Sequence, residues 1–288
     1  MFRAFDKAIA VDEESVDRGI GRIVECARAM NAKYYSEGTS VTDTVTELGS
    51  LAKKTGIRPL ADVDVLFRMP PGTYSRFNDY TGNGQSALLQ EVREVLRQRY
   101  PRTEIRGDGP VVVVSFSDQP AVEVVPGVLV ADGSNILYAE AWVPVTRDGG
   151  EWERADYGAE LGALDAADGP LGGQLRRLIR YMKAWRRHCD TELKSIVLEL
   201  MAVDFAKTWS DERSSFTFDD WLVRDFLRYM VNNYTTTYRL PGTAKTIETG
   251  YGWYIEALED AAEACRHDPD DVLYRHYWRK VLGDDFGK

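Results

Sequence analysis

The spacing of apolar and polar residues predicts an alternation of helices and strands in the first half of the chain. From Val16 to Met30 the apolar positions recur at helical spacing behind the acidic opening DEES, which predicts a long amphipathic first helix. Thr-rich and Val-rich runs that flank GSLAKKTG predict two strands joined by a tight turn. These strands are expected over residues 41–48 and 62–67, a second helix over 85–100, and further strands over 110–116, 121–125 and 136–143.

The pattern after about Trp152 is helical almost throughout. Helices are expected over residues 171–188, 192–209, 219–233, 245–267 and 270–282. The sequence therefore predicts an N-terminal α/β half and a C-terminal helical half, which we place at residues 1–165 and 166–288. The connection TRDGGEWERADYG is polar but too short to act as a free linker, so we expect the halves to pack together around a cleft.

Composition narrows the class of protein. The 288 residues are 44% hydrophobic and 28% charged, an ordinary globular balance for one large domain or two intimate ones. No apolar run reaches the roughly 18 residues that a membrane span needs, and the N-terminus lacks a secretory signal, so we expect a cytoplasmic protein. The net charge of -10 has the wrong sign for extensive binding to nucleic acid.

The cysteines predict neither disulfides nor a zinc site. Cys26, Cys189 and Cys265 are odd in number and scattered, as expected in a reducing compartment. Zinc binding with His188 or His267 is an alternative, but neither pair has the spacing of strong zinc ligands. We therefore interpret the three thiols as buried or incidental.

Gly49 and Ser50 follow a predicted strand and open a predicted helix, an arrangement that suits an anionic phosphate. An ordinary turn is the alternative. Asp62 and Asp64 then lie two residues apart on a strand, so their carboxylates share one face. Charges at a solvated strand edge would explain them, but the apolar residues around them favour a divalent cation with oxygen ligands.

Glu123 supplies a third carboxylate in the apolar strand AVEVVPG. An ionised Glu among valines is costly unless it is paired, metal-bound or turned to water. Taken with Asp62 and Asp64, it predicts a magnesium site.

These segments together resemble a known family. A strand that ends in Gly-Ser, an Asp-x-Asp strand and a later acidic strand residue followed by a Pro turn are similar to the polymerase-beta-type nucleotidyltransferases. The segments GSLAKKTGIRPLADVDVLF, AVEVVPG, AWVPVTRDGGEW and LIRYMKAWRRHCDTELKSIVLELM resemble the bacterial cGAS/DncV-like branch, which makes cyclic oligonucleotide signals in anti-phage defence. The resemblance implies an α+β fold, with a mixed-sheet nucleotidyltransferase core packed against a C-terminal helical domain.

The resemblance also implies roles for individual residues. Asp62, Asp64 and Glu123 would be catalytic and bind two Mg²⁺ ions, for which Mn²⁺ could substitute, and Gly49 and Ser50 would hold the donor triphosphate. Lys183 in YMKAW and Ser195 in LKSIVLE match positions that clamp the triphosphate. The alternatives are a surface helix charge for Lys183 and a helix-start residue for Ser195.

The chain departs from the family at two positions. Aspartate is commoner where Glu123 stands, and a base-stacking Tyr often occupies the position of Ile196. The implied substrates are ATP and/or GTP, with a regulatory protein from a defence operon as a possible partner. A non-cyclising nucleotidyltransferase acting on RNA, protein or a small molecule is the alternative function, and a nucleotide-binding scaffold without catalysis is a third.

Overall fold

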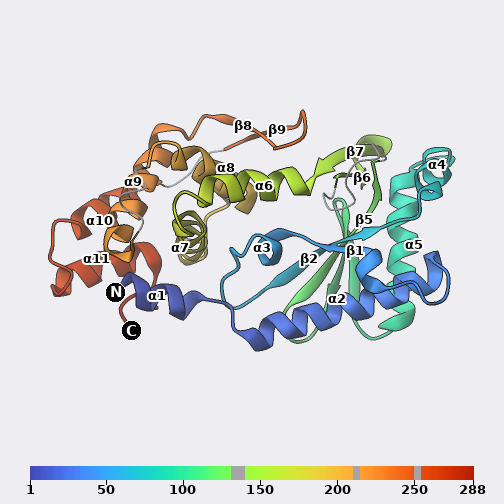
Figure 1. Ribbon diagram of the computed structural model, residues 1–288, viewed down its shortest axis with the longest axis horizontal. Helices are drawn as coiled ribbons and strands as arrows, with labels where there is room; N and C mark the ends of the chain where they lie inside the picture. Colours follow the sequence, from blue (N-terminus) through green and yellow to red (C-terminus); the bar gives the residue numbers. More distant parts are fainter. Residues whose placement is uncertain (131–139, 210–214, 250–253) are drawn as a thin grey trace. The chain divides into compact units, whose positions relative to one another are not determined.

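The computed structural model describes residues 1–130, 140–209, 215–249 and 254–288, and these form two compact units (Figure 1). One unit, here called the α/β unit, consists of residues 11–54 and 58–159. The other, here called the helical unit, consists of residues 1–10, 55–57 and 160–288. Two short N-terminal segments thus belong to the helical unit.

The α/β unit contains α2 (Glu13–Tyr34), η1 (Val41–Asp43), β1 (Val45–Glu47), α3 (Gly49–Ala52), β2 (Asp62–Arg68), α4 (Gly72–Asn78), α5 (Gly84–Arg99), β3 (Glu104–Asp108), β4 (Val111–Ser115), β5 (Ala121–Leu129), β6 (Glu140–Val145), η2 (Arg147–Gly149) and β7 (Glu151–Asp156). Helix α6 (Tyr157–Asp168) carries the chain into the helical unit. That unit contains α1 (Phe2–Ile9), α7 (Gln174–His188), α8 (Ser195–Ala206), η4 (Phe216–Phe218), α9 (Asp219–Asn232), β8 (Thr237–Arg239), β9 (Thr246–Glu248), α10 (Tyr254–Ala264) and α11 (Val272–Leu282).

A seven-stranded mixed sheet is the framework of the α/β unit. Its strand order is β1-β2-β5-β4-β3, and β6 pairs with both β5 and β7. Strands β2 and β5 run parallel, whereas the other pairings of this sheet are antiparallel. A parallel pair needs a crossover connection, and here the chain between the two strands forms α4, α5, β3 and β4.

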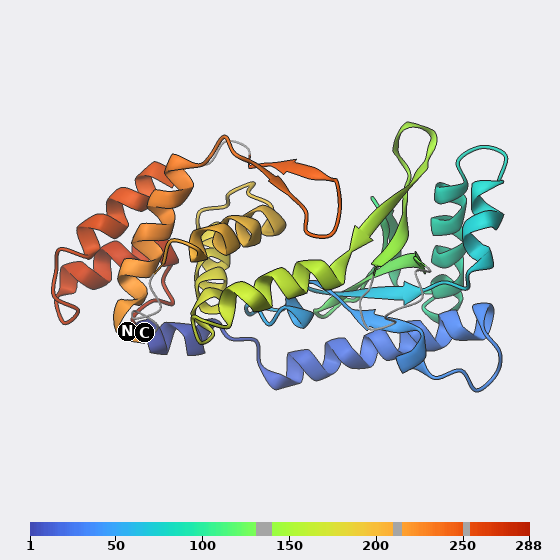
Figure 2. The same ribbon diagram turned by 45° about the horizontal axis from the view of Figure 1, so that its top comes forward.

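The two faces of β2 have different environments because its side chains alternate. Val63, Val65 and Phe67 belong to the large core that β2 shares with α2 and α5. The sheet and these two helices can be followed in Figure 2. Leu66 belongs to a separate small core formed by Leu48, Val125, Ala141 and Val143. The Asp-x-Asp positions therefore lie on the face of β2 opposite the large core.

Helix α2 is the long first helix that the sequence predicts. Asp12 caps it, because its Oδ1 accepts a hydrogen bond of 2.8 Å from the backbone N–H of Ser15. Two glutamates in the first turn interact favourably with the positive end of the helix dipole. The buried stripe of Ile23, Cys26 and Met30 faces the large core.

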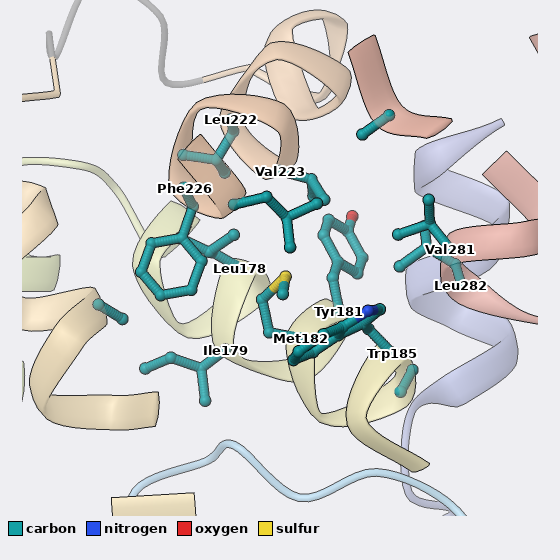
Figure 3. Packing of buried hydrophobic residues seen from close by; sticks show 14 of the residues in the cluster. Leu178, Ile179, Tyr181, Met182, Trp185, Leu222, Val223, Phe226, Val281 and Leu282 are labelled. Carbon is teal, nitrogen blue, oxygen red and sulfur yellow. The ribbon is translucent and has the colours of Figure 1, made fainter. Parts of the chain in front are cut away.

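Helix α7 is at the centre of the helical unit. Figure 3 shows its residues Leu178, Met182 and Trp185 among side chains from α9 and α11. Those three residues are fully buried. Helix α1 adds to the same core, since the Phe2 ring lies 5.1 Å from the Trp278 ring, centroid to centroid.

A buried carboxylate joins α9 to α7. Asp219 is completely buried and accepts two hydrogen bonds of 2.8 Å from the guanidinium of Arg177. The hydroxyl of Tyr181 donates a third, also 2.8 Å long. A buried charge is tolerated only when it is paired and hydrogen-bonded, and this network satisfies both conditions.

Several predicted elements differ from the structure. Residues 151–156, interpreted as part of a polar connection, form β7, whose alternating charged residues pair with β6. The polar strand β3 was not predicted, because only Ile105 of its residues is buried. Of the helix expected over 245–267, residues 246–248 form β9 of a short hairpin, and α10 begins at Tyr254.

Helices α1, α4 and α6 and strand β8 were also not predicted, and the remaining differences concern element ends. Residues 41–43 form a 3-10 turn, and the strand there is limited to β1. Gly49–Ala52 forms the short helix α3, which confirms that Gly49 and Ser50 open a helix after the first strand. Residues 136–139 of one predicted strand and 250–253 of one predicted helix lie outside the described residues. The α+β class with a helical C-terminal part is confirmed.

We predict that Asp219→Ala will destabilise the helical unit. The substitution leaves the buried guanidinium of Arg177 without its partner, a loss that costs about 3–5 kcal/mol in comparable buried pairs. Chemical denaturation followed by circular dichroism measures it. The variant Arg177→Met with Asp219→Leu is the control, since it removes both charges and should recover most of the loss. Equal loss in the single and double variants would contradict the explanation.

Candidate active site

The two aspartates of β2 point to the same face of the sheet. Asp62 and Asp64 alternate with the buried Val63 and Val65, and both carboxylates are half-buried. This is the arrangement that the i, i+2 spacing predicts. The apolar alternation of the strand, which places the valines in the large core, turns the carboxylates away from it.

Glu123 lies beside them on β5. In the parallel pairing of β2 with β5, Asp64 is the register partner of Glu123 and Asp62 is that of Ala121. Partners across a strand pair project from the same face of the sheet. The structure therefore brings together the three carboxylates that the sequence singles out, although Glu123 is separated from them by more than fifty residues along the chain.

The electrostatics of Glu123 reflect this proximity. Burial raises the pKa of the Glu123 carboxyl to about 7, and the negative charges of Asp64 and Asp62 add to the increase. The charge of Asp108 acts in the same direction, whereas the Arg106 guanidinium opposes the shift. Ionisation of Glu123 beside Asp62 and Asp64 is therefore unfavourable, which is a condition that a bound metal ion relieves.

Gly49 approaches the carboxylate of Asp64 closely. The backbone N–H of Leu48 donates a hydrogen bond of 2.9 Å to the carbonyl oxygen of Asp64, which holds the start of α3 against β2. The φ angle of Gly49 is +58°, and a Cβ there would lie 1.8 Å from Oδ2 of Asp64. Only glycine fits this position. Ser50, the next residue, is half-buried in the first turn of α3.

The donor set fits a hard divalent cation. Asp62, Asp64 and Glu123 offer carboxylate oxygens, which Mg²⁺ and Mn²⁺ prefer to nitrogen or sulfur ligands. Within residues 1–130, 140–209, 215–249 and 254–288, no three His, Cys, Asp or Glu side chains form a ready-made metal-binding group. Asp62, Asp64 and Glu123 share one face of the sheet, but they do not already surround a cation position.

Lys183 lies on α7 of the helical unit and has defined partners. Its Nζ forms an ion pair of 2.8 Å with Oε1 of Glu199 and donates a hydrogen bond of 2.9 Å to Oγ1 of Thr55. The residue is 8% exposed, so the interpretation as a surface helix charge is wrong.

Ser195 is the first residue of α8, and the cap position before it is Lys194. Its Oγ accepts a hydrogen bond of 2.9 Å from the guanidinium of Arg186. A hydroxyl that accepts from a cation keeps its own O–H for donation, which is what an anionic ligand requires. Ile196 packs against the hydrophobic core of the helical unit.

Sequence reasoning missed the partners of these two residues. Arg186 follows Lys183 by three residues, and Glu199 follows Ser195 by four, so each pair occupies one face of its helix. That spacing predicts a polar face on α7 and another on α8, but it does not predict that the two faces contact each other. The contacts between α7 and α8 supply this information.

The cysteines have environments in keeping with the sequence interpretation. Cys26 is buried, Cys189 is exposed, and Cys265 is between these extremes, all three as free thiols. Burial raises the pKa of the Cys26 and Cys265 thiols to about 12 in each case. These two side chains are protonated at neutral pH.

Comparison with known proteins gives consistent matches. The family model described as "Second Messenger Oligonucleotide or Dinucleotide Synthetase domain" matches residues 1–166. A probable cyclic nucleotide synthase from Bacillus cereus strain VD146 is 20% identical over 277 residues, which cover 83% of this chain and 80% of the relative.

Solved structures share the fold. Escherichia coli MS115-1 CdnC with ATP is similar, with a TM-score of 0.70, 17% identity and coverage of 99% of this chain and 97% of the other. A complex of that CdnC with HORMA-deltaN also matches, with a TM-score of 0.69, 16% identity and coverage of 99% and 96%. Vibrio cholerae DncV cyclic AMP-GMP synthase with a linear intermediate matches with a TM-score of 0.73, 14% identity and coverage of 97% and 92%. A search of the described helices finds none long and apolar enough to span a membrane.

We predict that Glu123→Gln will raise the melting temperature of the metal-free protein above pH 7. The folded chain holds the Glu123 proton up to a pKa of about 7, against 4.5 ordinarily. Ionisation of Glu123 therefore lowers the free energy of unfolding as pH rises from 4.5 to 7, and this loss is complete above pH 7. Thermal melts in a chelating buffer at pH 5 and pH 8 measure the effect.

The control is Glu104→Gln, which removes an exposed carboxylate from β3. The control should leave the melting temperature nearly unchanged. Adding Mg²⁺ or Mn²⁺ at pH 8 should stabilise the wild-type protein more than Glu123→Gln. An equal gain for Glu123→Gln at pH 5 and pH 8 would contradict the prediction.

Proposed function

The chain belongs to the family of Second Messenger Oligonucleotide or Dinucleotide Synthetase domains, which makes it a nucleotidyltransferase, and we propose that it makes a cyclic di- or trinucleotide. The observation that carries the proposal is the register of β2 with β5, because it groups three carboxylates beside Gly49. Such a group suits transfer between phosphates, where charge must be neutralised at the attacking and leaving oxygens.

Members of this family generally use divalent metal ions. We propose two Mg²⁺ ions, with Mn²⁺ as a substitute, held by Asp62, Asp64 and Glu123. When bound, the ions would activate the attacking hydroxyl and neutralise charge on the leaving group.

The proposed reaction joins two nucleotides. A ribose hydroxyl of one attacks the α-phosphorus of the other, a new O–P bond forms, and the bond to pyrophosphate breaks. The hydroxyl proton leaves, and we propose that Glu123, or the metal ion it would hold, helps to remove it. A second transfer within the linear product closes the ring and releases a second pyrophosphate.

The remaining residues would bind the triphosphate. The backbone at Gly49 and the hydroxyl of Ser50 lie at the start of α3, where N–H groups point outward. Lys183 would contribute a positive charge, and Ser195 a hydroxyl that Arg186 orients as a donor. ATP and GTP are the proposed substrates.

The cellular setting follows from the relatives. One related structure holds CdnC with HORMA-deltaN. We propose by analogy that a regulatory protein partner controls this chain within an anti-phage signalling system, in the cytoplasm. A nucleotidyltransferase that modifies RNA, protein or a small molecule is the alternative, and the net charge of -10 weighs against RNA.

The test is incubation with all four NTPs and Mg²⁺, followed by mass spectrometry. We expect an oligonucleotide that resists phosphatase and has the mass of the linear 5′-monophosphate oligonucleotide less one water. Asp62→Asn with Asp64→Asn should abolish both product and pyrophosphate release, because the charge that holds metal is lost while side-chain volume is kept. The proposal is refuted if every product is linear and phosphatase-sensitive. It is also refuted if the double variant releases pyrophosphate as the wild-type protein does.

Substitution of Lys183 tests the helical unit's part in binding. Loss of a charge-assisted contact to phosphate costs about 1.5–3 kcal/mol, so Lys183→Ala should weaken ATP or GTP binding about tenfold or more. The measurement is repeated in a Glu199→Gln background, where no carboxylate is left unpaired. Lys207→Ala, which removes a lysine of an exposed ion pair in the same unit, is the control. Wild-type affinity in Lys183→Ala would exclude this lysine from the site.

A further inference from the structure

Glu199 is a buried carboxylate that the proposed reaction does not use. It lies on α8, one turn after Ser195, and is 8% exposed. Its Oε1 accepts from Lys183 Nζ at 2.8 Å and from Thr55 Oγ1 at 3.5 Å. Because Lys183 Nζ also donates to Thr55 Oγ1 at 2.9 Å, the three side chains form a closed triangle within the helical unit.

The ion pair reduces the charge that Lys183 can offer to a ligand. A carboxylate 2.8 Å from the ammonium offsets most of its field in a site with little solvent. Lys183 also has three N–H groups, and Glu199 and Thr55 engage two of them. Among the described residues this leaves one N–H for a phosphate oxygen, in a direction that the other two contacts fix.

Stability alone does not explain the pair. A buried ion pair is often no more stable than apolar residues of similar volume, because desolvation offsets the attraction. A lysine that only held the two helices together could be replaced by an apolar residue without loss. The triangle instead leaves the side chain of Lys183 accessible over about a tenth of its surface. Glu199 and Thr55 set the effective charge and the orientation of its ammonium group.

Thr55 links this triangle to a second element of the proposed site. It is fully buried, and it follows α3, the helix that starts with Gly49 and Ser50, by three residues. Residues 55–57 belong to the helical unit even though the chain on either side of them belongs to the α/β unit. The contact with Lys183 is one of the anchors that hold this short segment in the helical unit.

We propose that Glu199 is a positioning residue that weakens the hold of Lys183 on the triphosphate enough for pyrophosphate to leave. The inference rests on the proposed function, since it assumes that Lys183 binds the phosphates. Binding that is equally strong for substrate and product slows turnover when product release limits the rate. A lysine with a partly compensated charge holds the triphosphate in position and still releases pyrophosphate after transfer.

The test compares wild-type protein with Glu199→Gln, which keeps the volume and a hydrogen-bond acceptor but removes the charge. Isothermal titration with pyrophosphate should show binding about tenfold tighter in the variant. Product inhibition by pyrophosphate should strengthen by a similar factor, and KM for ATP or GTP and kcat should both fall. Asp260→Asn, which removes a carboxylate from another ion pair of the same unit, is the charge-matched control and should change none of these values.

A loss of structure would produce the opposite result, because a disordered Lys183 binds pyrophosphate more weakly. Glu199→Asp covers the case in which Glu199→Gln does not fold: it keeps a charged partner but withdraws it by one methylene. It should shift pyrophosphate binding in the same direction by a smaller factor. Pyrophosphate affinity that is unchanged or weaker in the variants overturns the inference.

The two proposals fail in different ways. Wild-type protein that binds pyrophosphate but makes no oligonucleotide would refute the proposed function. Wild-type protein that makes cyclic product, together with a Glu199→Gln variant that has wild-type pyrophosphate affinity, would refute the role of Glu199 alone.

Discussion

The parallel pairing of β2 with β5 is the constraint on which the candidate site depends. It places Asp64 beside Glu123. Because side chains alternate along both strands, these carboxylates project from the face of the sheet opposite the large core. A slip of one residue in either strand would turn its carboxylates into that core, at a large cost in desolvation. The valines that pack against α2 and α5 fix the register of β2 with β5. They thereby fix which carboxylates lie together on the opposite face.

Much of this was predictable from local pattern. The Asp-x-Asp strand follows from alternation, and the long first helix follows from its spacing and acidic cap. The partner of Glu123 was not predictable from spacing, because strand register depends on contacts between distant segments; resemblance to a family supplied it. Strand β7 was missed because its charged residues resemble a connection, and they form a strand through pairing with β6.

The helical unit shows where sequence reasoning stops. Lys183 was identified from its surrounding motif, but Glu199 and Thr55, which determine its charge and direction, were not. A buried polar contact between two helices leaves little trace in either helix alone, since each residue is compatible with an exposed position. The same holds for Asp219, which was assigned only to a helix and proves to be the acceptor of a buried network.

The contacts of α1 affect how the helical unit can fold. The rings of Phe2 and Phe5 pack against the Phe286 ring, with centroids 5.0 and 5.5 Å apart, although more than 280 residues of sequence separate them. The whole α/β unit lies between these two segments in the sequence. Contacts of such long sequence separation are slow to form, so we expect the core of the helical unit to close later than the sheet of the α/β unit. The rings of Phe2 and Phe5 also lie 5.4 and 5.7 Å from the Tyr181 ring, so α7 can cover the apolar face of α1 before Phe286 joins the core.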